Sequence, residues 1–436
     1  MISGEPRATP VAILGAGLTG MSAALALQRA QVPFRIFEQH MQAGGHAVTL
    51  EEDGYRFDRT GHLLHLRHEE LRKEVIGWLA GETVNIERKS RVFSQGVYTH
   101  YPFQANTFGL PKAVVYACLL GFIQATTRGA QPKPRNFEEF CRQHFGDGIS
   151  EHFMLPYNAR LWGVPPAEIT SDWCQRFVPI PSLEEVLAGA LGQPSRELGY
   201  NTHFIYPRRG IGQLSLAMQA QIPNLELGRA PQRIDLARRS LEFDTENVDF
   251  NVLISSLPLP KLIELLDEPP KAVLDASRRL RCTHLYYLDV ALRAPCPQDL
   301  HWVYVPEPKY PFYRVGCYSN FSKEMAPPGC ANLYVELASR EPPMLSEVLP
   351  KVIEGLLELQ LIGSPEDVAF ARVRRIDHAY VIFDQGYFEA LSVITPFLEQ
   401  ERILSTGRYG GWNYSSMEDA LVFGRAAAKK AVEWLV

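Results

Sequence analysis

The hydrophobic and polar positions of the first forty residues follow the order strand, turn, helix, strand. Pro10–Leu14 is a short apolar run that predicts a buried strand, and Leu18–Ala30 is an Ala- and Leu-rich stretch that predicts a helix. A second apolar run, Phe34–Glu38, predicts another buried strand. Alternation around Tyr55–Asp58 predicts a hairpin-like return to the sheet. The N-terminal segment therefore has the pattern of a βαβ unit.

The pattern changes twice along the rest of the chain. From Asn106 to about Pro179 helical periodicity dominates, as in Phe137–His144 and Ile149–Leu155. Farther on, aromatic and β-branched runs broken by Pro and Gly predict an antiparallel sheet. These runs are Leu285–Leu292, Trp302–Pro306, Phe312–Ser319 and Ala331–Leu337. A buried-strand run at Val252–Leu257 leads into a Leu-rich helix, and the chain ends with a strand at Ile403–Ser405, a loop and an Ala-rich helix.

Length, charge and cysteine spacing exclude several classes of protein. At 436 residues the chain is too long for one simple core, so two or three domains are expected. The formal net charge of −5 argues against a nucleic-acid binder, so a bound phosphate must be met by a few placed arginines and helix N-termini. The seven cysteines are scattered without a C-x-x-C pair, which indicates neither a zinc site nor a disulfide framework and favours a reducing cytoplasm.

Neither a signal peptide nor a membrane span is indicated. The N-terminus shows no signal-peptide apolar region before the first strand. The most apolar stretch, Ala113–Ile123, covers eleven residues, which is too short to span a bilayer. We expect a buried helix there, with a surface that dips into a membrane as the alternative.

A glycine fingerprint occupies the turn of the βαβ unit. Gly15-x-Gly17-x-x-Gly20 follows the first strand and opens the first helix. The first glycine permits the tight turn, the second lets backbone approach a pyrophosphate, and the third lets the helix pack on the strand. The helix N-terminus offers free N–H groups to the phosphates. Glu38, eighteen residues past Gly20, would accept hydrogen bonds from a ribose diol and repel a 2′-phosphate. A dinucleotide site is therefore expected.

Two further segments favour FAD as this dinucleotide. The glycine pair Gly44-Gly45 follows Glu38 closely and would let backbone come near the cofactor. Near the C-terminus, Gly407-Arg408-Tyr409-Gly410-Gly411 precedes Ser416 and Asp419, which resemble a capping box at the start of the last helix. A strand, glycine loop and helix that return to the N-terminal unit are how FAD-dependent oxidoreductase folds hold both ends of a flavin. Ordinary helix capping is the alternative for the C-terminal pieces alone.

Four longer motifs resemble the UDP-galactopyranose mutases, and the eukaryotic branch more than the shorter bacterial one. They are Tyr101-Pro-Phe-Gln104, Phe153-Met-x-Pro-Tyr157-Asn158-x-x-x-Trp162, Pro311-Phe-Tyr-Arg314 and Gly411-Trp-Asn-Tyr414. The resemblance covers nearly the whole chain in the same order. The wider flavin amine oxidase and protoporphyrinogen oxidase superfamily is expected to share only the glycine fingerprint, the glycine pair and the C-terminal loop.

The resemblance implies roles for individual residues. His62 would lie beside the isoalloxazine, and Arg176 and Arg314 would clamp a substrate pyrophosphate as catalytic residues. The nucleotide base and ribose would be held by Tyr101, Gln104, Phe153, Tyr157, Asn158 and Trp162. The phosphates and sugar would be surrounded by Asn201, Trp302, Tyr304, Tyr380 and Tyr414. Arg408 and Met417 would lie near the FAD. Each assignment has a structural alternative: Arg314 could be a solvated strand residue, and Trp162 or Phe153 could be core.

The chain also departs from the mutase pattern. Ala105 stands where the eukaryotic mutases usually have Asn, and Thr60 replaces the first glycine of the Gly-Gly-His that ends at His62. Phe321 stands where a Tyr is common beside the phosphates, so one hydroxyl contact would be lost. The run Met417-Glu418-Asp419 is more acidic than usual. These departures favour a nucleotide-sugar site in general over UDP-galactose in particular.

The resemblance implies pyranose–furanose ring isomerisation of a nucleotide-diphosphate sugar, in which N5 of the reduced flavin attacks the anomeric carbon. Arg176 and Arg314 would stabilise charge on the departing diphosphate, and NAD(P)H could serve as the reductant. The alternative is an FAD-dependent oxidoreductase of the amine oxidase or protoporphyrinogen oxidase type. A non-catalytic nucleotide-sugar binder is a third hypothesis. The sequence offers no Gly-x-Ser-x-Gly, metal cluster or convincing carboxylate pair.

The expected fold is α/β, with three parts interleaved along the chain. A Rossmann-like FAD-binding domain is expected from residues 1–105, 226–265 and 401–436. A helical insert is expected over 106–185, and an antiparallel β-sheet substrate domain from 186–225 and 266–400. The substrate is expected in the cleft between them.

Overall fold

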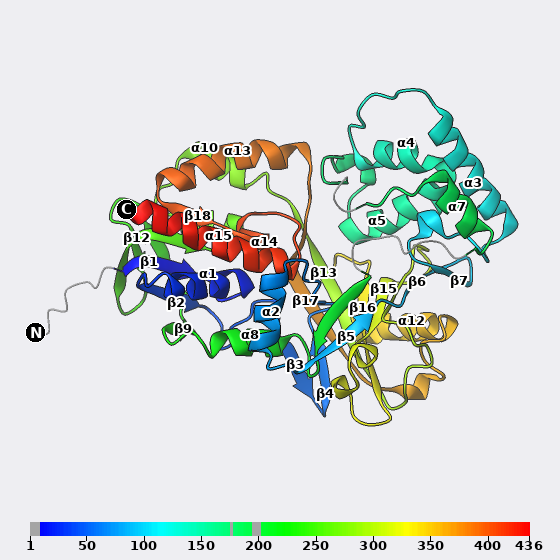
Figure 1. Ribbon diagram of the computed structural model, residues 1–436, viewed down its shortest axis with the longest axis horizontal. Coiled ribbons are helices and arrows are strands. Elements are labelled where there is room, and N and C mark those ends of the chain that lie inside the picture. Colours follow the sequence, from blue (N-terminus) through cyan, green and yellow to red (C-terminus); the bar gives the residue numbers. More distant parts are fainter. Residues whose placement is uncertain (1–8, 175–177, 194–201) are drawn as a thin grey trace, which may run out of the picture.

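The computed structural model describes residues 9–174, 178–193 and 202–436. Figure 1 shows three parts: a body with a parallel sheet and its covering helices, a second sheet beside it, and a group of helices at the upper right. The expected class, α/β with a Rossmann-like part, a helical part and an antiparallel sheet, is confirmed.

The first sheet has the strand order β10-β11-β12-β1-β2-β9, with β18 paired to β12. Its parallel strands are β1 (Thr9–Leu14), β2 (Phe34–Glu38), β9 (Leu225–Leu227), β12 (Asn247–Ser255) and β18 (Ile403–Ser405). The antiparallel extension consists of β10 (Arg233–Asp235) and β11 (Ser240–Glu242). Strands from the start, middle and end of the chain thus lie side by side, as an interleaved dinucleotide-binding part requires.

Helices α1 (Leu18–Arg29) and α15 (Met417–Leu435) pack against each other beside this sheet (Figure 1). Their backbones approach closely because α15 has a glycine at the crossing: a Cβ on Gly424 would lie 2.2 Å from the Thr19 carbonyl oxygen. The Ser22 hydroxyl donates to the Leu421 carbonyl at 2.6 Å across the same contact. The C-terminal helix is therefore fastened to the helix that opens at the glycine turn.

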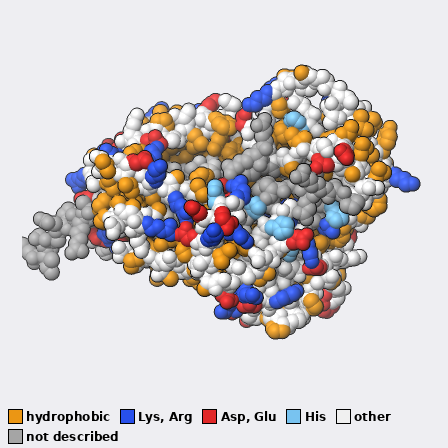
Figure 2. Space-filling view, viewed as in Figure 1, with side chains coloured by type: hydrophobic (Ala, Val, Ile, Leu, Met, Phe, Trp, Pro, Cys, Tyr) orange, Lys and Arg blue, Asp and Glu red, His pale blue; other side chains and the backbone are white. Residues whose placement is uncertain are grey.

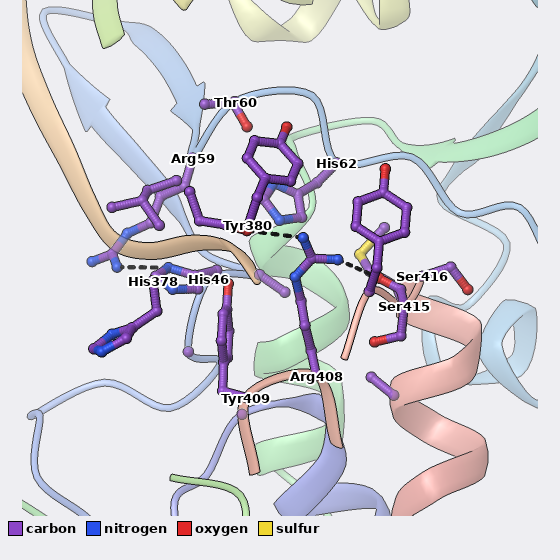
Figure 3. Close-up of a pocket in the computed structure, with 18 of the residues that line it drawn as sticks. His46, Arg59, Thr60, His62, His378, Tyr380, Arg408, Tyr409, Ser415 and Ser416 are labelled. Atoms are coloured by element: carbon purple, nitrogen blue, oxygen red, sulfur yellow. Dashed lines mark hydrogen bonds between the residues drawn. The ribbon is translucent and has the colours of Figure 1, made fainter. Parts of the chain in front are cut away.

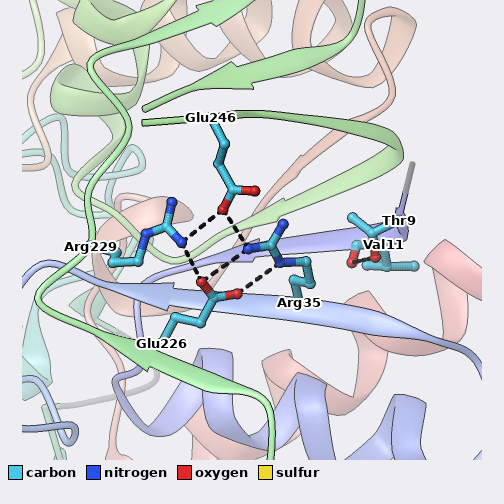
Figure 4. A network of polar contacts seen from close by, with 6 residues as sticks. All are labelled: Thr9, Val11, Arg35, Glu226, Arg229 and Glu246. Carbon is cyan, nitrogen blue, oxygen red and sulfur yellow. Dashed lines mark hydrogen bonds and ion pairs between the residues drawn. The ribbon is translucent and has the colours of Figure 1, made fainter. Parts of the chain in front are cut away.

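An ion-pair network fastens edge strand β9 to β2 (Figure 4). Arg35 of β2 binds Glu226 of β9 at 2.8 Å and Glu246 at 2.8 Å. Arg229 binds the same two carboxylates at 2.7 and 2.8 Å. Both guanidinium groups also lie over the Phe37 ring, at 5.0 and 5.8 Å from its centroid. The backbone N–H of Arg229 also donates to the Glu38 carbonyl at 2.8 Å, so the network adjoins the strand end that carries Glu38.

The second sheet has the order β17-β13-β16-β15-β14-β6-β7. Its strands are β6 (Ser90–Ser94), β7 (Val97–His100), β13 (Cys282–Leu292), β14 (Trp302–Tyr304), β15 (Phe312–Cys317), β16 (Ala331–Leu337) and β17 (Val368–Val381). All neighbours are antiparallel except β14 and β6, which are parallel. Strands β6 and β7, from the segment that we expected with the FAD-binding part, join this sheet. The strand expected over Phe312–Ser319 stops at Cys317, because Tyr318–Phe321 forms the short helix α11.

Two small sheets and several helices connect these layers. The predicted hairpin strand is present, but among the described strands β4 (Tyr55–Asp58) pairs with β3 (Thr49–Glu52) and not with the larger sheet. Strands β5 (Thr83–Glu87) and β8 (His203–Pro207) form the other small sheet. The helices of these connections are α2 (Glu69–Trp78), α8 (Gly212–Gln219), α9 (Leu259–Leu265), α10 (Lys271–Ser277), α12 (Leu345–Glu358), α13 (Gln385–Gln400) and α14 (Gly407–Gly410). Short helical turns are η1 (Phe103–Ala105), η3 (Pro166–Glu168), η4 (Lys323–Met325) and η5 (Pro365–Asp367).

The predicted helical insert contains α3 (Lys112–Thr127), α4 (Phe137–Ile149), the π-helical turn η2 (Ser150–Met154), α5 (Leu155–Trp162) and α7 (Leu183–Ala190). The helix expected at Ala113–Ile123 is present, but it is buried on one face only. One face of α3 packs on α4, but Tyr116, Leu120 and Ile123 on the other face are 67%, 39% and 38% exposed. Hydrophobic side chains accordingly gather over the helical region in Figure 2. Among the described residues, none of the helices has the length and apolar character needed to cross a membrane.

Candidate active site

A cavity of about 1170 Å³ collects side chains from all three parts of the fold. It is lined by nineteen of the residues that the sequence predicts for the site: Gly15, Gly17, Glu38, Gly44, Gly45, His62, Tyr101, Gln104, Phe153, Tyr157, Asn158, Trp162, Trp302, Tyr304, Arg314, Tyr380, Arg408, Tyr414 and Met417. Gly20 lies beneath the glycine turn and does not line the cavity. Arg176 and Asn201 lie outside the described residues, so the proposed pairing of Arg176 with Arg314 stays a prediction.

The glycine turn has the geometry that a bound pyrophosphate needs. Gly15 adopts a φ of 91°, in the left-handed region that favours glycine. A Cβ on Gly20 would lie 1.9 Å from the Gly15 carbonyl oxygen, so that glycine lets the helix pack on the turn. Gly17 is different, because its Cβ position is open apart from the Gly45 Cα at 3.9 Å. Helix α1 begins there without a side-chain cap, and Leu18 and Thr19 of its first turn line the cavity, so uncapped N–H groups are available to a ligand.

Glu38 is buried beside this turn and already supports it. One carboxylate oxygen accepts a hydrogen bond from Ala16 N at 2.8 Å, and the other accepts one from His40 N at 3.0 Å. The carboxylate keeps lone pairs toward the cavity that it lines. A diol hydroxyl at this end of the cavity would therefore find an oriented anionic acceptor.

Histidine and arginine side chains lie around the cavity near the loop that ends at His62 (Figure 3). Thr60 is held at a φ of 68°, a left-handed conformation that is strained for a β-branched residue. Burial lowers the pKa of His62 to about 4, and its Nδ1 has no partner among the described residues. Burial, reinforced by the Arg59 charge, lowers the pKa of His46 to about 3. Both rings are therefore neutral at physiological pH, and each keeps one donor and one acceptor.

Arg408, in the short helix α14 that precedes α15, is held in a fixed orientation. Its Nη1 donates to the Ser415 carbonyl at 2.7 Å and its Nη2 to the Ala379 carbonyl at 2.9 Å. The guanidinium lies over the Tyr414 ring, 4.8 Å from the centroid. Because its partners are neutral carbonyls and a ring, the positive charge of Arg408 is oriented rather than cancelled. Ser416 and Asp419 form the predicted capping box beside it, directly before Met417 opens α15.

Stacked aromatic rings line the other end of the cavity. Tyr101 stacks on Tyr304 at 4.8 Å and 25°, and the Arg88 guanidinium lies 4.9 Å over the Tyr101 ring. Phe153 stacks on Tyr157 at 5.2 Å and 8°. Such rings offer flat faces on which a base can stack.

A second aromatic group lies nearer the C-terminal loop. Trp162 contacts Tyr380 edge-on at 5.5 Å, and Tyr380 stacks on Tyr414 at 6.1 Å. The indole N–H groups of Trp162 and Trp302 are buried without a hydrogen-bond partner among the described residues. Both indoles line the cavity, so a bound ligand could satisfy them.

Arg314 projects from β15 onto the cavity wall, but not as a free cation. Its Nε and Nη2 bind the two carboxylate oxygens of Glu336 at 3.0 and 2.6 Å, and Nη2 also donates to the Tyr380 hydroxyl at 3.1 Å. Glu336 is fully buried on the neighbouring strand β16. The bidentate pair fixes the plane of the guanidinium, which excludes the alternative of a solvated strand residue.

The polar residues Gln104 and Asn158 are partly used by the protein. The Gln104 side-chain amide donates to the Pro179 carbonyl at 3.0 Å, and that of Asn158 donates to the Met154 carbonyl at 2.7 Å. Phe321, which we expected beside the phosphates, does not line the cavity. Its ring is buried against Tyr206 at 5.2 Å and His301 at 5.6 Å. The expected loss of a phosphate contact at this position is therefore wrong.

Solved structures of several flavin enzymes and one sequence-family model resemble the chain. Residues 13–75 match the NAD(P)-binding Rossmann-like domain. Reduced UDP-galactopyranose mutase is 26% identical with a TM-score of 0.91, covering 98% of this chain and 96% of that one. Putrescine oxidase bound to putrescine is 16% identical with a TM-score of 0.69, over 98% and 99% of the two chains. Cyclohexylamine oxidase from Brevibacterium oxydans IH-35A is 14% identical with a TM-score of 0.68, over 98% and 99%.

These similarities define the class of protein first. The chain has the Rossmann-based fold of the flavin-dependent mutases and amine oxidases, and a flavin is the cofactor that the comparisons indicate. Within that class, the chain resembles the structure of reduced UDP-galactopyranose mutase over nearly its whole length. The two oxidases are under a quarter identical and therefore support the fold alone.

Several cavity residues were not predicted from the sequence. Arg59 and His46 contact each other at 3.2 Å, and both line the cavity. Their positions next to His62 and directly after Gly45 could have indicated them. No local signal marks Glu336, because only the register of β15 with β16 brings it to Arg314.

Proposed function

We propose that the chain is an FAD-dependent enzyme that interconverts the pyranose and furanose rings of a nucleotide-diphosphate sugar. One observation carries this proposal: a single cavity joins the glycine turn at one end to the Tyr101–Tyr304 stack and Arg314 at the other. Such a cavity suits a dinucleotide and a second, phosphate-bearing nucleotide ligand together. A hydride donor such as an amine would have no use for an oriented guanidinium.

The residues at the glycine end fit FAD. We assign the pyrophosphate to Gly17 and the N-terminus of α1, the ribose to Glu38, and the flavin ring to the neighbourhood of His62 and Arg408. The open Cβ position at Gly17 supports this, because a pyrophosphate must approach the backbone there. When bound and reduced, the flavin supplies a nucleophilic nitrogen for the anomeric carbon. The FAD-binding part would comprise residues 1–105, 226–265 and 401–436, apart from strands β6 and β7, which belong to the antiparallel sheet.

The other end would bind the nucleotide sugar. Tyr101 and Tyr304 would sandwich or flank the base, and Gln104 would contact its edge. Arg314, aided by Arg176, would bind the diphosphate and stabilise the charge that builds as the sugar–phosphate bond breaks. Because Arg314 donates to the Tyr380 oxygen, the Tyr380 hydroxyl proton stays available for a phosphate or sugar oxygen.

His62 would act as a neutral group next to the reacting centre. Its pKa, lowered to about 4 by burial, keeps the ring uncharged, and its unpartnered Nδ1 can donate to or accept from the cofactor edge or the sugar. The chemistry then needs no protein nucleophile. NAD(P)H is the reductant that we propose for the flavin.

The test is nucleotide binding by the purified protein, which should carry the absorbance of bound FAD. We design the variant Arg314→Gln together with Glu336→Gln, so that no buried carboxylate is left unpaired. UDP affinity should fall by about 100-fold, since charge-assisted hydrogen bonds contribute roughly 1.5–3 kcal/mol each, while FAD content stays at the wild-type level. Unchanged UDP affinity would remove Arg314 from the substrate site and favour the oxidoreductase alternative.

A further inference from the structure

Helix α3 exposes an apolar face to solvent, while its other face packs on α4. Tyr116, Leu120 and Ile123 follow one another at helical spacing along the exposed face. The helix covers 16 residues, so this face runs for about 24 Å. Single exposed apolar side chains are ordinary on a protein surface, but a continuous apolar face is typical of an interaction site.

Helix α7 extends this apolar face. Its Leu183, Leu187 and Leu191 recur every four residues and are 38%, 38% and 72% exposed, and α7 packs on α3. Phe108, which is 61% exposed, connects the two helices, since its backbone N–H donates to the Gly189 carbonyl at the end of α7. Figure 2 shows hydrophobic side chains gathered over this region. We call the exposed side chains of α3 and α7, together with Phe108, the α3–α7 face. None of them lines the cavity, so the face lies outside the candidate active site.

The segment that contains α3 is basic, although the whole chain carries a formal net charge of −5. From residue 88 to residue 137 the sequence contains neither Asp nor Glu. The cations of this segment are Arg88, Lys89, Arg91, Lys112, Arg128, Lys133 and Arg135. Two of those that follow α3 are neutralised, Lys133 by Asp172 and Arg135 by Glu139.

The remaining two cations lie at the two ends of α3. Lys112 is the first residue of the helix and Arg128 is the residue that ends it. Neither forms an ion pair with another described residue. Lys112 adds its charge to the positive end of the helix dipole, because the first turn has no acidic residue. Glu184, at the start of α7, is an exposed acidic residue of the neighbouring helix. The apolar face of α3 thus lies between two available positive charges.

We propose that the α3–α7 face binds peripherally to the surface of a bilayer that contains anionic phospholipids. Its apolar side chains enter the boundary between headgroups and acyl chains, and the Tyr116 hydroxyl stays at the level of the headgroups. Lys112 and Arg128 bind lipid phosphates, while the apolar stems of these side chains lie along the membrane boundary. This binding does not depend on the proposed ring isomerisation.

A second copy of the chain is the other occupant that an apolar face suits, but the charges disfavour it. If two copies met through antiparallel α3 helices, each Lys112 would lie beside the Arg128 of the other copy. Like charges would then be brought together at both ends of the contact. An anionic lipid surface neutralises both cations at once, and it also covers a face that is wider than one helix.

The test is flotation of the full, FAD-loaded chain with lipid vesicles. One set of vesicles is phosphatidylcholine alone, and the other is a two-to-one mixture of phosphatidylcholine and phosphatidylglycerol. The chain should float with the mixed vesicles, and its partition coefficient for phosphatidylcholine alone should be about 10-fold lower. Lys112→Gln together with Arg128→Gln should remove this difference. The proposal is overturned if the wild-type chain does not float with the mixed vesicles. An undiminished preference in the double variant would also contradict it.

A matched pair of leucine variants tests the apolar contact. Leu120→Glu should lower partition onto the mixed vesicles by at least about 10-fold, because a carboxylate would enter the membrane boundary. Leu216→Glu is the control, since Leu216 is an exposed leucine of helix α8 that does not line the cavity, and it should partition as wild type does. Both variants should keep the wild-type FAD content. Equal partition of Leu120→Glu and wild type would overturn the proposal. So would a lipid-free oligomer, detected by analytical ultracentrifugation, that Leu120→Glu dissociates, because the face would then join copies of the chain.

Discussion

Arg314 and Glu336 face each other across the neighbouring strands β15 and β16 and form a bidentate ion pair at 3.0 and 2.6 Å. Glu336 is fully buried, so the pair orients the guanidinium but also cancels part of its charge. A diphosphate at this wall would therefore meet a cation that is already positioned and only partly neutralised. The Arg314 guanidinium is thus fixed in position, but it attracts a phosphate less strongly than an unpaired arginine would.

Glu336→Gln tests this arrangement. Removing the carboxylate charge leaves a buried guanidinium without its anion, so the free energy of unfolding should fall by about 3 kcal/mol. A bound diphosphate can replace that anion. UDP should therefore bind Glu336→Gln about 10-fold more tightly than it binds wild type. It should also raise the unfolding temperature of the variant by more than it raises that of wild type. Calorimetric titration and thermal unfolding with and without UDP measure both effects.

Asp289→Asn is the matched control for that prediction. Asp289 is also fully buried in this sheet and binds Arg374 at 2.9 Å, but neither residue lines the cavity. Its loss should destabilise the fold without any change in UDP affinity. If Glu336→Gln behaves like Asp289→Asn, then Arg314 does not face the phosphates.

Alanine at the glycine turn should separate cofactor binding from folding. In Gly17→Ala the new methyl group meets no atom of the described residues closer than 3.9 Å, so stability without cofactor should change little. The methyl group would instead occupy the approach of the pyrophosphate, and FAD affinity should fall by at least about 10-fold, or 1.4 kcal/mol. Flavin absorbance after gel filtration reports this loss.

Gly20→Ala should give the opposite result. Its methyl group would lie 1.9 Å from the Gly15 carbonyl oxygen, so helix α1 must shift. The free energy of unfolding should fall by roughly 1–3 kcal/mol or more, in denaturant titrations of protein stripped of flavin. Equal FAD affinity in Gly17→Ala and wild type would contradict the assignment of the pyrophosphate to this turn.

Tyr101→Ala should weaken nucleotide binding because it removes the ring that stacks on Tyr304 at 4.8 Å. Stacking of a base on an aromatic side chain contributes roughly 1–3 kcal/mol, so the Kd for UDP should rise about 10-fold. Tyr101→Phe keeps the ring and should restore most of the affinity. An alanine at Tyr116, which is exposed on α3 and does not line the cavity, should have no effect. Equal Kd values for UDP in Tyr101→Ala and Tyr116→Ala, measured by calorimetry, would contradict the prediction.

Asp58 should make stability depend on pH. Burial raises its pKa from 3.8 to about 7, although Thr49 and Tyr206 donate hydrogen bonds to the carboxylate. Between these two pH values the folded chain holds a proton that the unfolded chain has lost. Stability contributed by this proton is therefore fully present below pH 4 and is lost as the pH rises through about 7, by up to roughly 4 kcal/mol.

Asp58→Asn should remove the larger part of this decline, because an amide stays neutral at every pH in the window; a smaller decline should remain from Asp289, whose pKa burial raises to about 6. Denaturant unfolding at pH 5 and pH 8 makes the comparison, with Asp53→Asn in the adjacent exposed turn as the control. An equal decline in Asp58→Asn and wild type would show that another group titrates.

Much of the fold was predictable because its signals are local. The strand at Thr9–Leu14, the turn at Gly15 and the helix from Leu18 each follow from residues a few positions apart. The exposed face of α3 was not predictable in this way. Its residues are apolar all round, so the sequence cannot say which side packs on α4.

The candidate site likewise has a part that local motifs predicted and a part that depends on long-range contacts. Motifs placed Tyr101, Tyr157 and Tyr414 together, and the structure brings them to one cavity. The pairing of Arg314 with Glu336 depends on the register between the neighbouring strands β15 and β16. Such long-range contacts leave no periodic or spacing signal in a single sequence.

The most direct test of the account is anaerobic incubation of the dithionite-reduced, FAD-loaded protein with UDP-galactopyranose and with other UDP-, GDP- and dTDP-sugars. For at least one of these sugars, we predict many turnovers of pyranose–furanose interconversion with no net consumption of reductant. The oxidised protein should show no interconversion. Absence of ring isomerisation for every sugar tested, or a product whose formation oxidises or reduces one flavin per turnover, would contradict the proposed function.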